Sequence, residues 1–206
     1  MMVAVTTEHT PVEQCTLQGP HLKEECGLVE PKAHKARLRL DALAASDCET
    51  VRHWRNTDDI RLGLRTPYVL THGMQARFYE QVVSQPQKHR YWAIRGERFL
   101  GMAGLTDIEW ENGHAEISLV LDPAEQGKGH GMEVVGLVLT EAFHRMRLLT
   151  VFGEVYEHNP ARAFWFRALQ RYGAEADNVL LPRRKWWDGV AQAGIVFWFR
   201  AEAFRS

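Results

Sequence analysis

The chain has 206 residues, of which 45% are hydrophobic and 25% are charged, a composition typical of a soluble globular protein with a sizeable core. Its 25 lysine and arginine residues balance 26 acidic residues, so the charge gives no reason to expect nucleic acid or an anionic membrane as a partner. The three cysteines lack a C-x-x-C spacing, and neither a bilayer-spanning run nor a signal-peptide core is visible, so we expect a cytoplasmic protein without a structural zinc site or disulfide framework.

The N-terminal segment differs in character from the rest of the chain. Over residues 1–34 the apolar residues follow no period, and prolines interrupt them. We therefore predict that residues 1–34 form a tail or an added arm, and that residues 35–206 form one domain.

The first part of this domain predicts a strand followed by two helices. Residues 36–43 alternate between apolar and polar side chains, as a half-buried strand does. Ser46 and Glu49 have the spacing of a capping box, so a helix is expected to begin there. Thr71 is placed to cap a second helix, which must end before Pro86.

The rest of the domain predicts antiparallel hairpins and then strands that alternate with helices. Residues 89–108 indicate a hairpin that turns near residues 95–97. Asn112-Gly113 is a two-residue turn signal before the next strand, and Asp188-Gly189 is a similar signal near the C-terminus. This order predicts an α/β fold with a mixed central sheet.

A glycine-rich loop, QGKGHG over residues 126–131, stands where a strand gives way to an apolar helix. A ligand can approach its backbone closely, and the unpaired N–H groups and dipole of the following helix favour phosphate oxygens. A P-loop is excluded because Gly129 follows Lys128 where serine or threonine is required. A dinucleotide-binding loop, with Glu154 as the acid that binds ribose, stays open, as does a turn without a ligand.

Within this loop, Gln126, Gly129 and Gly131 fit the pattern Q-x-x-G-x-G. The pattern resembles the acetyl-CoA pyrophosphate loop of the GNAT superfamily of N-acyltransferases. The resemblance covers about residues 36–200, because further pieces follow in the family's order: a strand ending at Asp122-Pro123, the long helix after the loop, the strand LLTVFGEVYEHN and a helix opening at Asn159-Pro160. It implies the GNAT acyl-CoA N-acyltransferase fold, an α/β fold in which helices flank a mixed central sheet and two central strands splay apart around the acyl-pantetheine arm.

The resemblance also implies an activity, an acetyl-CoA-dependent transfer of an acetyl group to a primary amine within a ternary complex. The stretch HWRNTDDIRLGL, followed by a helix from Thr71, looks like the branch that acts on amino sugars and ribosomal-protein N-termini. Within that branch, WRN-x-x-x-IR and FWFRALQRYGA look most like acetyltransferases of nucleotide-linked amino sugars. A small molecule, first of all a nucleotide-linked amino sugar, is therefore the expected acceptor. The alternatives are a protein N-terminus, a non-catalytic module that binds acyl-CoA, and a nicotinamide-dependent enzyme. A homodimer stays open, and no catalytic metal is expected because the histidines form no H-E-x-x-H motif.

The cofactor-binding residues that the resemblance implies lie on the strand before the loop, in the loop, and before the later helix. They are Leu119, Val120, Leu121, Gln126, Gly127, Lys128, Gly129, His130, Gly131 and Asn159. For Asn159, capping of the helix after Pro160 is an equally good role.

Acyl transfer to an amine requires a group that removes the proton of the ammonium form. Alternation places Glu116 on the face of one strand beside His114, and Glu154 on the face of the later strand with Tyr156 and His158. Glu116 is the first candidate for the base and Glu154 the second, followed by the two histidines. The competing interpretation of Glu116 is an exposed strand residue paired with a basic side chain.

A proton donor for the departing thiolate is harder to assign. Many family members carry a tyrosine where this chain has Phe166, so Tyr156 and Tyr172 are the candidates. Cys48 is a weak candidate for a nucleophile. Three arginines are expected to meet anionic groups of the acceptor: Arg55, Arg61 and Arg65. The run Arg183-Arg184-Lys185 is expected to be solvated, although contact with substrate phosphates stays open.

Overall fold

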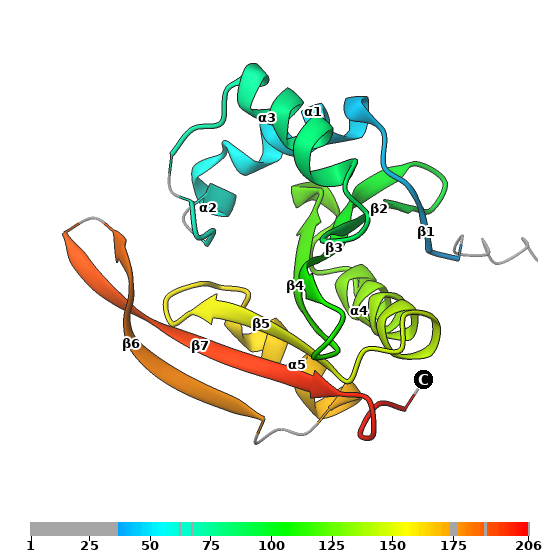
Figure 1. The fold of residues 1–206 in the computed structure, drawn as a ribbon. Helices are drawn as coiled ribbons and strands as arrows, with labels where there is room; N and C mark the ends of the chain where they lie inside the picture. The colour runs from blue at the N-terminus through cyan, green and yellow to red at the C-terminus, as the bar shows by residue number, and fades with distance from the viewer. Residues whose placement is uncertain (1–36, 62, 67, 174–176, 188, 206) are drawn as a thin grey trace, which may run out of the picture. The chain divides into compact units, whose positions relative to one another are not determined.

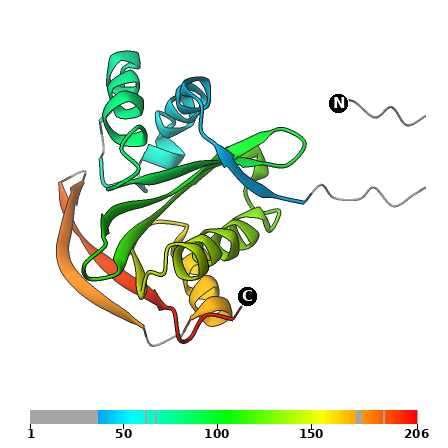
Figure 2. The ribbon, with the colours of Figure 1, turned by 45° about the vertical axis from the view of Figure 1, so that its right-hand side comes forward.

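The computed structural model describes residues 37–61, 63–66, 68–173, 177–187 and 189–205. Within these residues seven strands form one sheet in the order β1-β2-β3-β4-β5-β7-β6. Helices α1, α2 and α3 lie on one side of the sheet, and α4 and α5 lie on the other (Figures 1 and 2). The predicted α/β fold with a mixed central sheet is confirmed. The predicted tail, residues 1–34, lies outside the described residues.

Strands and helices follow one another as the sequence patterns predict. Their bounds are β1 Arg39–Ala42, α1 Ala45–Arg55, α2 Asp58–Arg61, α3 His72–Phe78, β2 Arg90–Arg95, β3 Phe99–Glu109, β4 His114–Leu121, α4 His130–Thr140, β5 Thr150–Tyr156, α5 Arg162–Tyr172, β6 Asn178–Trp187 and β7 Val190–Arg200. Helices α3 and α4 each continue into a π-helical turn, Tyr79–Val83 and Glu141–Arg145. Among the described residues no helix is both long enough and apolar enough to cross a membrane.

The two predicted helix starts have different outcomes. Thr71 caps α3 as expected, because its hydroxyl accepts a hydrogen bond from the N–H of Met74 at 3.3 Å. The predicted capping box of Ser46 and Glu49 is wrong. Helix α1 starts after Ala44, whose N–H donates to the Asp47 carboxylate at 3.0 Å. An acidic residue nearer the strand therefore takes the role of Glu49.

The hairpin predictions hold in part. β2 ends at Arg95 and β3 begins at Phe99, which confirms the turn near residues 95–97. Asn112-Gly113 is not a two-residue turn, because a four-residue turn separates β3 from β4 and the N–H of Gly113 donates to the Glu109 carbonyl at 2.8 Å. A bulge at Asp107, with φ of 48°, shifts the register just before it. Asp188 lies outside the described residues.

The central strands β4 and β5 pair only at one end. They run parallel and are in register at His114–Glu116 of β4 and Thr150–Phe152 of β5. Beyond that point β4 remains paired with β3 as far as Leu121, and β5 remains paired with β7 as far as Tyr156. The two strands therefore splay apart, as the family resemblance implied.

Two apolar clusters hold this sheet between the helices. The larger one joins the sheet to α4 and α5 and includes fully buried residues of α4, namely Val134, Val135, Val138 and Leu139. The smaller one lies beneath α1 and α3, around Val51 and Met102. Burying each such side chain contributes about 1.5–3 kcal/mol, so the splay is held open by well-packed layers on both faces.

Candidate active site

The loop after β4 has a backbone that only glycine adopts easily. Gly127 and Gly129 have φ angles of 76° and 86°, in the left-handed region. A Cβ atom at either position would meet nothing within 4 Å, so backbone conformation rather than crowding requires glycine there. Gly131 is needed for a different reason, because a Cβ atom would lie 3.0 Å from the ring of Phe164.

Helix α4 begins in this loop with its N–H groups uncapped by any side chain. Gly129 is the N-cap, and no side-chain hydrogen bond caps the first turn. Eleven residues of helix align their peptide dipoles toward this end, which gives it partial positive charge. The site is therefore suited to the oxygens of a phosphate group.

Charged side chains around the loop form contacts that the sequence patterns did not predict. Glu125 accepts hydrogen bonds from Lys128 at 3.2 Å and from Arg98 at 2.7 Å, and His130 Nε2 lies 3.2 Å from it. The interactions with Lys128, first, and with Arg98 hold the pKa of Glu125 below its ordinary value. The Gln126 amide donates to the carbonyl of Leu121 at 3.5 Å, at the edge of the splay.

The backbone of β4 presents alternate residues to the opening between the strands. The N–H of Asp122 donates to the Leu100 carbonyl of β3 at 2.8 Å, so by alternation Val120 also directs its backbone toward β3. Leu119 and Leu121 then direct their N–H and C=O groups toward the splay. Of the three β4 residues expected to bind the cofactor, these two are placed to use their backbone.

Two carboxylates meet where the strands begin to separate. Arg65 Nη2 donates to Glu116 Oε1 at 2.6 Å and to Glu154 Oε2 at 3.3 Å, so one guanidinium nitrogen contacts both acids. The side chains of Glu116 and Glu154 are 16% and 5% exposed, whereas that of Arg65 is 60% exposed. The structure thus brings together the two candidate bases and one candidate substrate-binding arginine from three distant parts of the sequence.

A second arginine, which sequence reasoning did not place here, reaches one of the two acids, Glu154. Arg184 Nε donates to Glu154 Oε1 at 2.8 Å. It lies in β6 beside a bulge at Arg183, where φ is 53° and the register with β7 shifts. Pro182, unusual inside a strand, was the available signal of this irregularity. The expectation that Arg183-Arg184-Lys185 is solvated is wrong for Lys185, whose residue is 7% exposed.

Tyr156 is the candidate proton donor that the structure places beside the acids. Its residue is 3% exposed, and burial is the main cause that raises its pKa above the ordinary value. Nearby Glu154 acts in the same direction. The Lys185 ammonium group lies 4.8 Å from the centre of the Tyr156 ring. The phenol therefore keeps its proton over the neutral pH range.

The segment that carries Arg65, residues 63–66, is named the acceptor loop and is fastened through its backbone. Asn159 Nδ2 donates to the carbonyl of Gly63 at 3.0 Å, and Lys185 Nζ donates to that of Leu64 at 2.7 Å. Asn159 Oδ1 also accepts from the N–H of Ala161 at 2.8 Å. Asn159, expected to bind the cofactor, thus contacts the acceptor loop and the approach to α5.

The other two candidate substrate-binding arginines also have partners within the chain. Arg55 Nη2 donates to the hydroxyl of Thr66 at 3.3 Å, and burial lowers the pKa of Arg55 below its ordinary value. Arg61 forms an ion pair with Asp58 within α2. Arg55 thus supports the acceptor loop, Arg61 is paired within its own helix, and the contact of either with an acceptor stays a prediction.

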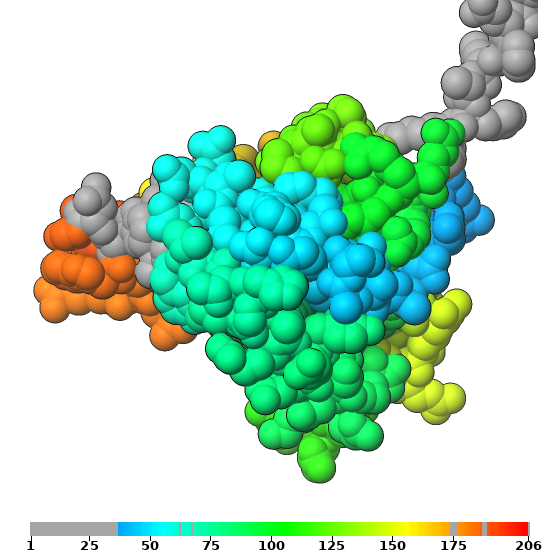
Figure 3. All heavy atoms as spheres, turned by 90° about the horizontal axis from the view of Figure 1, so that it is seen from above, coloured from blue at the N-terminus to red at the C-terminus, as the bar shows by residue number. Residues whose placement is uncertain are grey.

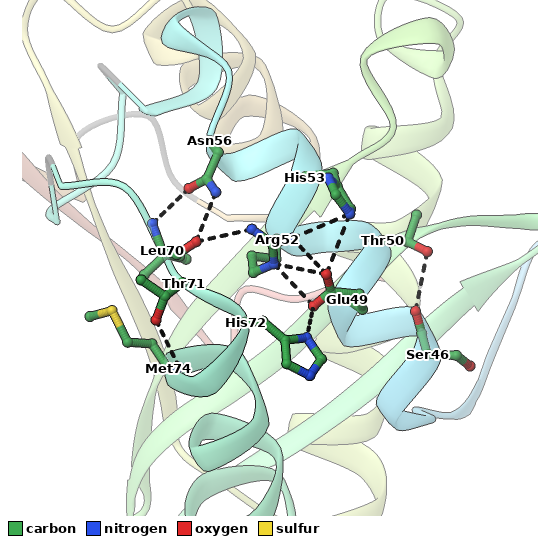
Figure 4. Close-up of polar contacts among 10 residues, drawn as sticks. All are labelled: Ser46, Glu49, Thr50, Arg52, His53, Asn56, Leu70, Thr71, His72 and Met74. Atoms are coloured by element: carbon green, nitrogen blue, oxygen red, sulfur yellow. Dashed lines mark hydrogen bonds and ion pairs between the residues drawn. The ribbon is translucent and has the colours of Figure 1, made fainter.

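Polar contacts also fasten the segment before α3 to α1 (Figure 4). Asn56 binds both backbone groups of Leu70, accepting from its N–H at 2.8 Å and donating to its carbonyl at 2.9 Å. Glu49 accepts hydrogen bonds from Arg52 at 2.6 Å and lies 3.1 Å from His72 Nδ1. Side chains of α1 thus hold the end of this segment and the start of α3. In Figure 3 the atoms of these helices, coloured blue to teal, occupy much of the face seen from above.

Some weaker candidates are placed away from the acid pair. Tyr172 donates its hydroxyl hydrogen to the Met132 carbonyl at 3.0 Å and packs against α4. Cys48 is 1% exposed, and burial raises the pKa of its thiol to about 11, which disfavours the reactive thiolate. His114 lies at the paired end of β4, 3.4 Å from Glu109.

A family model for an acetyltransferase (GNAT) domain matches residues 37–175. The chain belongs to the GNAT acetyltransferase family. No curated protein sequence matches it significantly. Among solved structures, a spermidine N-acetyltransferase from Vibrio cholerae in complex with CoA and spermine has a similar fold, with a TM-score of 0.70 and 18% identity over 81% of this chain and 97% of the other. A spermidine/spermine N-acetyltransferase from the same organism, in complex with manganese ions, gives a TM-score of 0.62 and 17% identity over 81% of this chain and 94% of the other.

Membership of the GNAT family confirms the predicted fold and the predicted class of enzyme, an acyltransferase. It also supports the predicted acetyl-CoA cofactor and leaves the nicotinamide-dependent alternative without support. The branch that acts on ribosomal proteins or amino sugars gains no support, because the family model is broader and the similar structures are polyamine acetyltransferases.

Proposed function

We propose that this GNAT protein transfers an acetyl group from acetyl-CoA to a primary amine of a small, positively charged molecule. The supporting observation is the acid pair of Glu116 and Glu154 at the start of the splay, on the two strands that separate there, with β4 leading on to the glycine loop and the uncapped helix α4. Acetyl-CoA, when bound, supplies the activated acetyl group.

The residues present fit that cofactor. Three features are suited to it: the glycines with left-handed backbone conformation, the uncapped first turn of α4, and the backbone N–H and C=O groups of Leu119 and Leu121 that face the splay. Gly127 to Gly131 would hold the pyrophosphate through backbone N–H groups, as the helix terminus favours. The N–H of Leu119 would then donate to a carbonyl oxygen within the splay, and such a donor stabilises negative charge that develops there.

Glu116 is the group that we assign to remove the proton from the acceptor amine. Its carboxylate is mostly buried, and its contacts are with Arg65. Glu154 differs because it also accepts a hydrogen bond from Arg184, which orients its carboxylate. Glu154 is therefore suited to attract an ammonium group, and Glu116 to take its proton. We assign Tyr156, which keeps its phenolic proton, the role of donating a proton to the departing thiolate.

The charge of the acceptor is inferred from the same acids. Nearly buried carboxylates favour an ammonium or another cationic group close to the reacting amine. A nucleotide-linked amino sugar would bring phosphates, which the carboxylates repel. The Vibrio cholerae enzyme of similar fold binds spermine, a cationic amine, which agrees with this choice.

Calorimetric titration with acetyl-CoA, coenzyme A and NADH, combined with thiol release over a panel of amines, tests the proposal. The panel contains spermidine, a short diamine, a nucleotide-linked amino sugar and a peptide with a free N-terminus. We expect acetyl-CoA to bind, NADH not to bind, and thiol release to be fastest with the polyamine or the diamine. Release only with the amino sugar or the peptide would overturn the choice of acceptor. Binding without release on any amine would favour a non-catalytic acyl-CoA module.

A further inference from the structure

The side chain of Arg65 lies in an unusual position for a residue of the acceptor loop. Its guanidinium group contacts both acids of the site, although its own side chain is 60% exposed. Hydrogen bonding to Glu116 is the main cause that raises the pKa of Arg65 above its ordinary value, so the residue stays charged. A permanent cation of the protein therefore occupies the place that the proposed function gives to the acceptor's ammonium group.

We propose that Arg65 is a specificity-determining residue, a resident counter-ion that a cationic acceptor replaces at Glu116 and Glu154. This inference rests on the proposed function for the nature of the acceptor. It adds that the affinity for an acceptor is set by exchange of one cation for another, rather than by filling an empty anionic site.

The backbone contacts of the acceptor loop indicate which part of it moves. Gly63 is bound through its carbonyl by Asn159, and Leu64 through its carbonyl by Lys185. Lys185 is itself buried against Tyr156. The backbone on the N-terminal side of Arg65 is therefore held, whereas the guanidinium group lies at the end of a long and mostly exposed side chain. Replacement requires a rotation of that side chain into solvent and no displacement of the loop backbone.

The charges of the site explain why the exchange is selective. Glu116 and Glu154 face Arg65 and Arg184, so each acid has an arginine partner while Arg65 is seated, and the ammonium group of Lys185 is held separately by Leu64 and Tyr156. When Arg65 leaves, Glu154 keeps Arg184, and Glu116 loses the guanidinium group that it contacts. One positive charge on the acceptor gives Glu116 a partner again. A neutral or anionic acceptor leaves Glu116 uncompensated in a mostly buried position, which is unfavourable.

The test is Arg65→Gln, which keeps a polar side chain of similar length and removes the charge. We expect the KM for spermidine to fall about fivefold, the ratio that corresponds to ~1 kcal/mol for a partly exposed ion pair. Arg65→Lys keeps the charge but loses the two-nitrogen contact with Glu116, so the KM should fall less than it does in Arg65→Gln. In Arg65→Gln the KM should also rise more steeply with ionic strength, because the acceptor then meets an uncompensated charge.

Arg145→Gln is the matched control. It removes one positive charge from an exposed arginine that pairs with Glu141 at 2.7 Å on the π-helical turn after α4. We expect this variant to leave the KM for spermidine and its salt dependence unchanged. Unchanged acetyl-CoA affinity in every variant would show that the fold and the cofactor site are intact.

A KM for spermidine that is unchanged or raised in Arg65→Gln, with acetyl-CoA affinity intact, would overturn the inference. A raised KM for a nucleotide-linked amino sugar in the same variant would instead make Arg65 a ligand for anionic acceptors. Calorimetric titration of spermidine into each variant with coenzyme A present tests the exchange without turnover. Absence of acetyl transfer to every amine would therefore defeat the proposed function, while the binding titration still decides the role of Arg65.

Discussion

The cofactor side and the acceptor side of the splay are built in different ways. On the cofactor side, β4, the glycine loop and α4 are consecutive in sequence, and the loop owes its shape to its own backbone. On the acceptor side, Arg65 lies 51 residues from Glu116 and 89 from Glu154, and Lys185 lies 121 residues from Leu64. The first side depends on local conformation. The second depends on long-range charge pairing, and substitutions should affect the two sides differently.

The largest expected effect comes from Glu116→Gln, which keeps the shape of the side chain and removes its ability to take a proton. We expect kcat to fall about 100-fold, within the range for loss of a general base. The remaining rate should rise with pH, because solvent must then deprotonate the amine. Thiol release followed across pH measures both effects.

Glu154→Gln is the companion variant that separates the two acids. Because Glu154 also pairs with Arg184, we expect its loss to raise the KM for a cationic amine more than it lowers kcat. If Glu116→Gln keeps its rate across the pH range, or if the two variants behave alike, our assignment of the base is wrong.

A smaller effect, on the affinity for acetyl-CoA, is expected from Gly129→Ala. This variant tests whether the cofactor side depends on the left-handed backbone conformation of its loop. Alanine at φ of 86° costs about 1–2 kcal/mol, so the Kd for acetyl-CoA should rise about tenfold in calorimetric titration. Gly73→Ala is the matched control, because a Cβ atom also meets nothing there and the φ angle is not left-handed. Equal affinities of the two variants would mean that the left-handed turn is not needed for cofactor binding.

The difference between the cofactor side and the acceptor side also explains which features could be predicted from the sequence alone. The glycine loop, β4 and α4 carry their signals within a few residues of one another, so the fold and the position of the cofactor loop could be predicted. Turn and cap positions were predicted less well where neighbouring residues compete. Asp47 rather than Glu49 completes the start of α1, because Asp47 accepts from the N–H of Ala44 whereas Glu49 is bound by Arg52.

The acceptor side could be predicted only as a set of separate residues. Glu116, Glu154 and Arg65 were each singled out, but no local pattern states that one guanidinium group contacts both acids. The bulge at Arg183 changes the direction of the side chains that follow it, so alternation alone could not bring Arg184 to Glu154 or bury Lys185. Long-range ion pairs depend on the folded arrangement of strands, which the sequence patterns describe only in outline.

The smallest expected effect concerns the charge cluster that holds α1 to the start of α3. Hydrogen bonding with Arg52 is the first cause that lowers the pKa of Glu49 to about 2, from an ordinary value of 4.5. The unfolded chain therefore binds the proton first as the pH falls, so the contribution of Glu49 to stability is present above pH 4.5 and is lost toward pH 2. The difference in urea midpoint between the original chain and Glu49→Gln should shrink over that interval. The difference should be small even at neutral pH, since ion pairs at the surface are weakened by solvent. If the difference in urea midpoint stays constant between pH 6 and pH 2.5, the ionisation of Glu49 does not help to hold α1 to the start of α3.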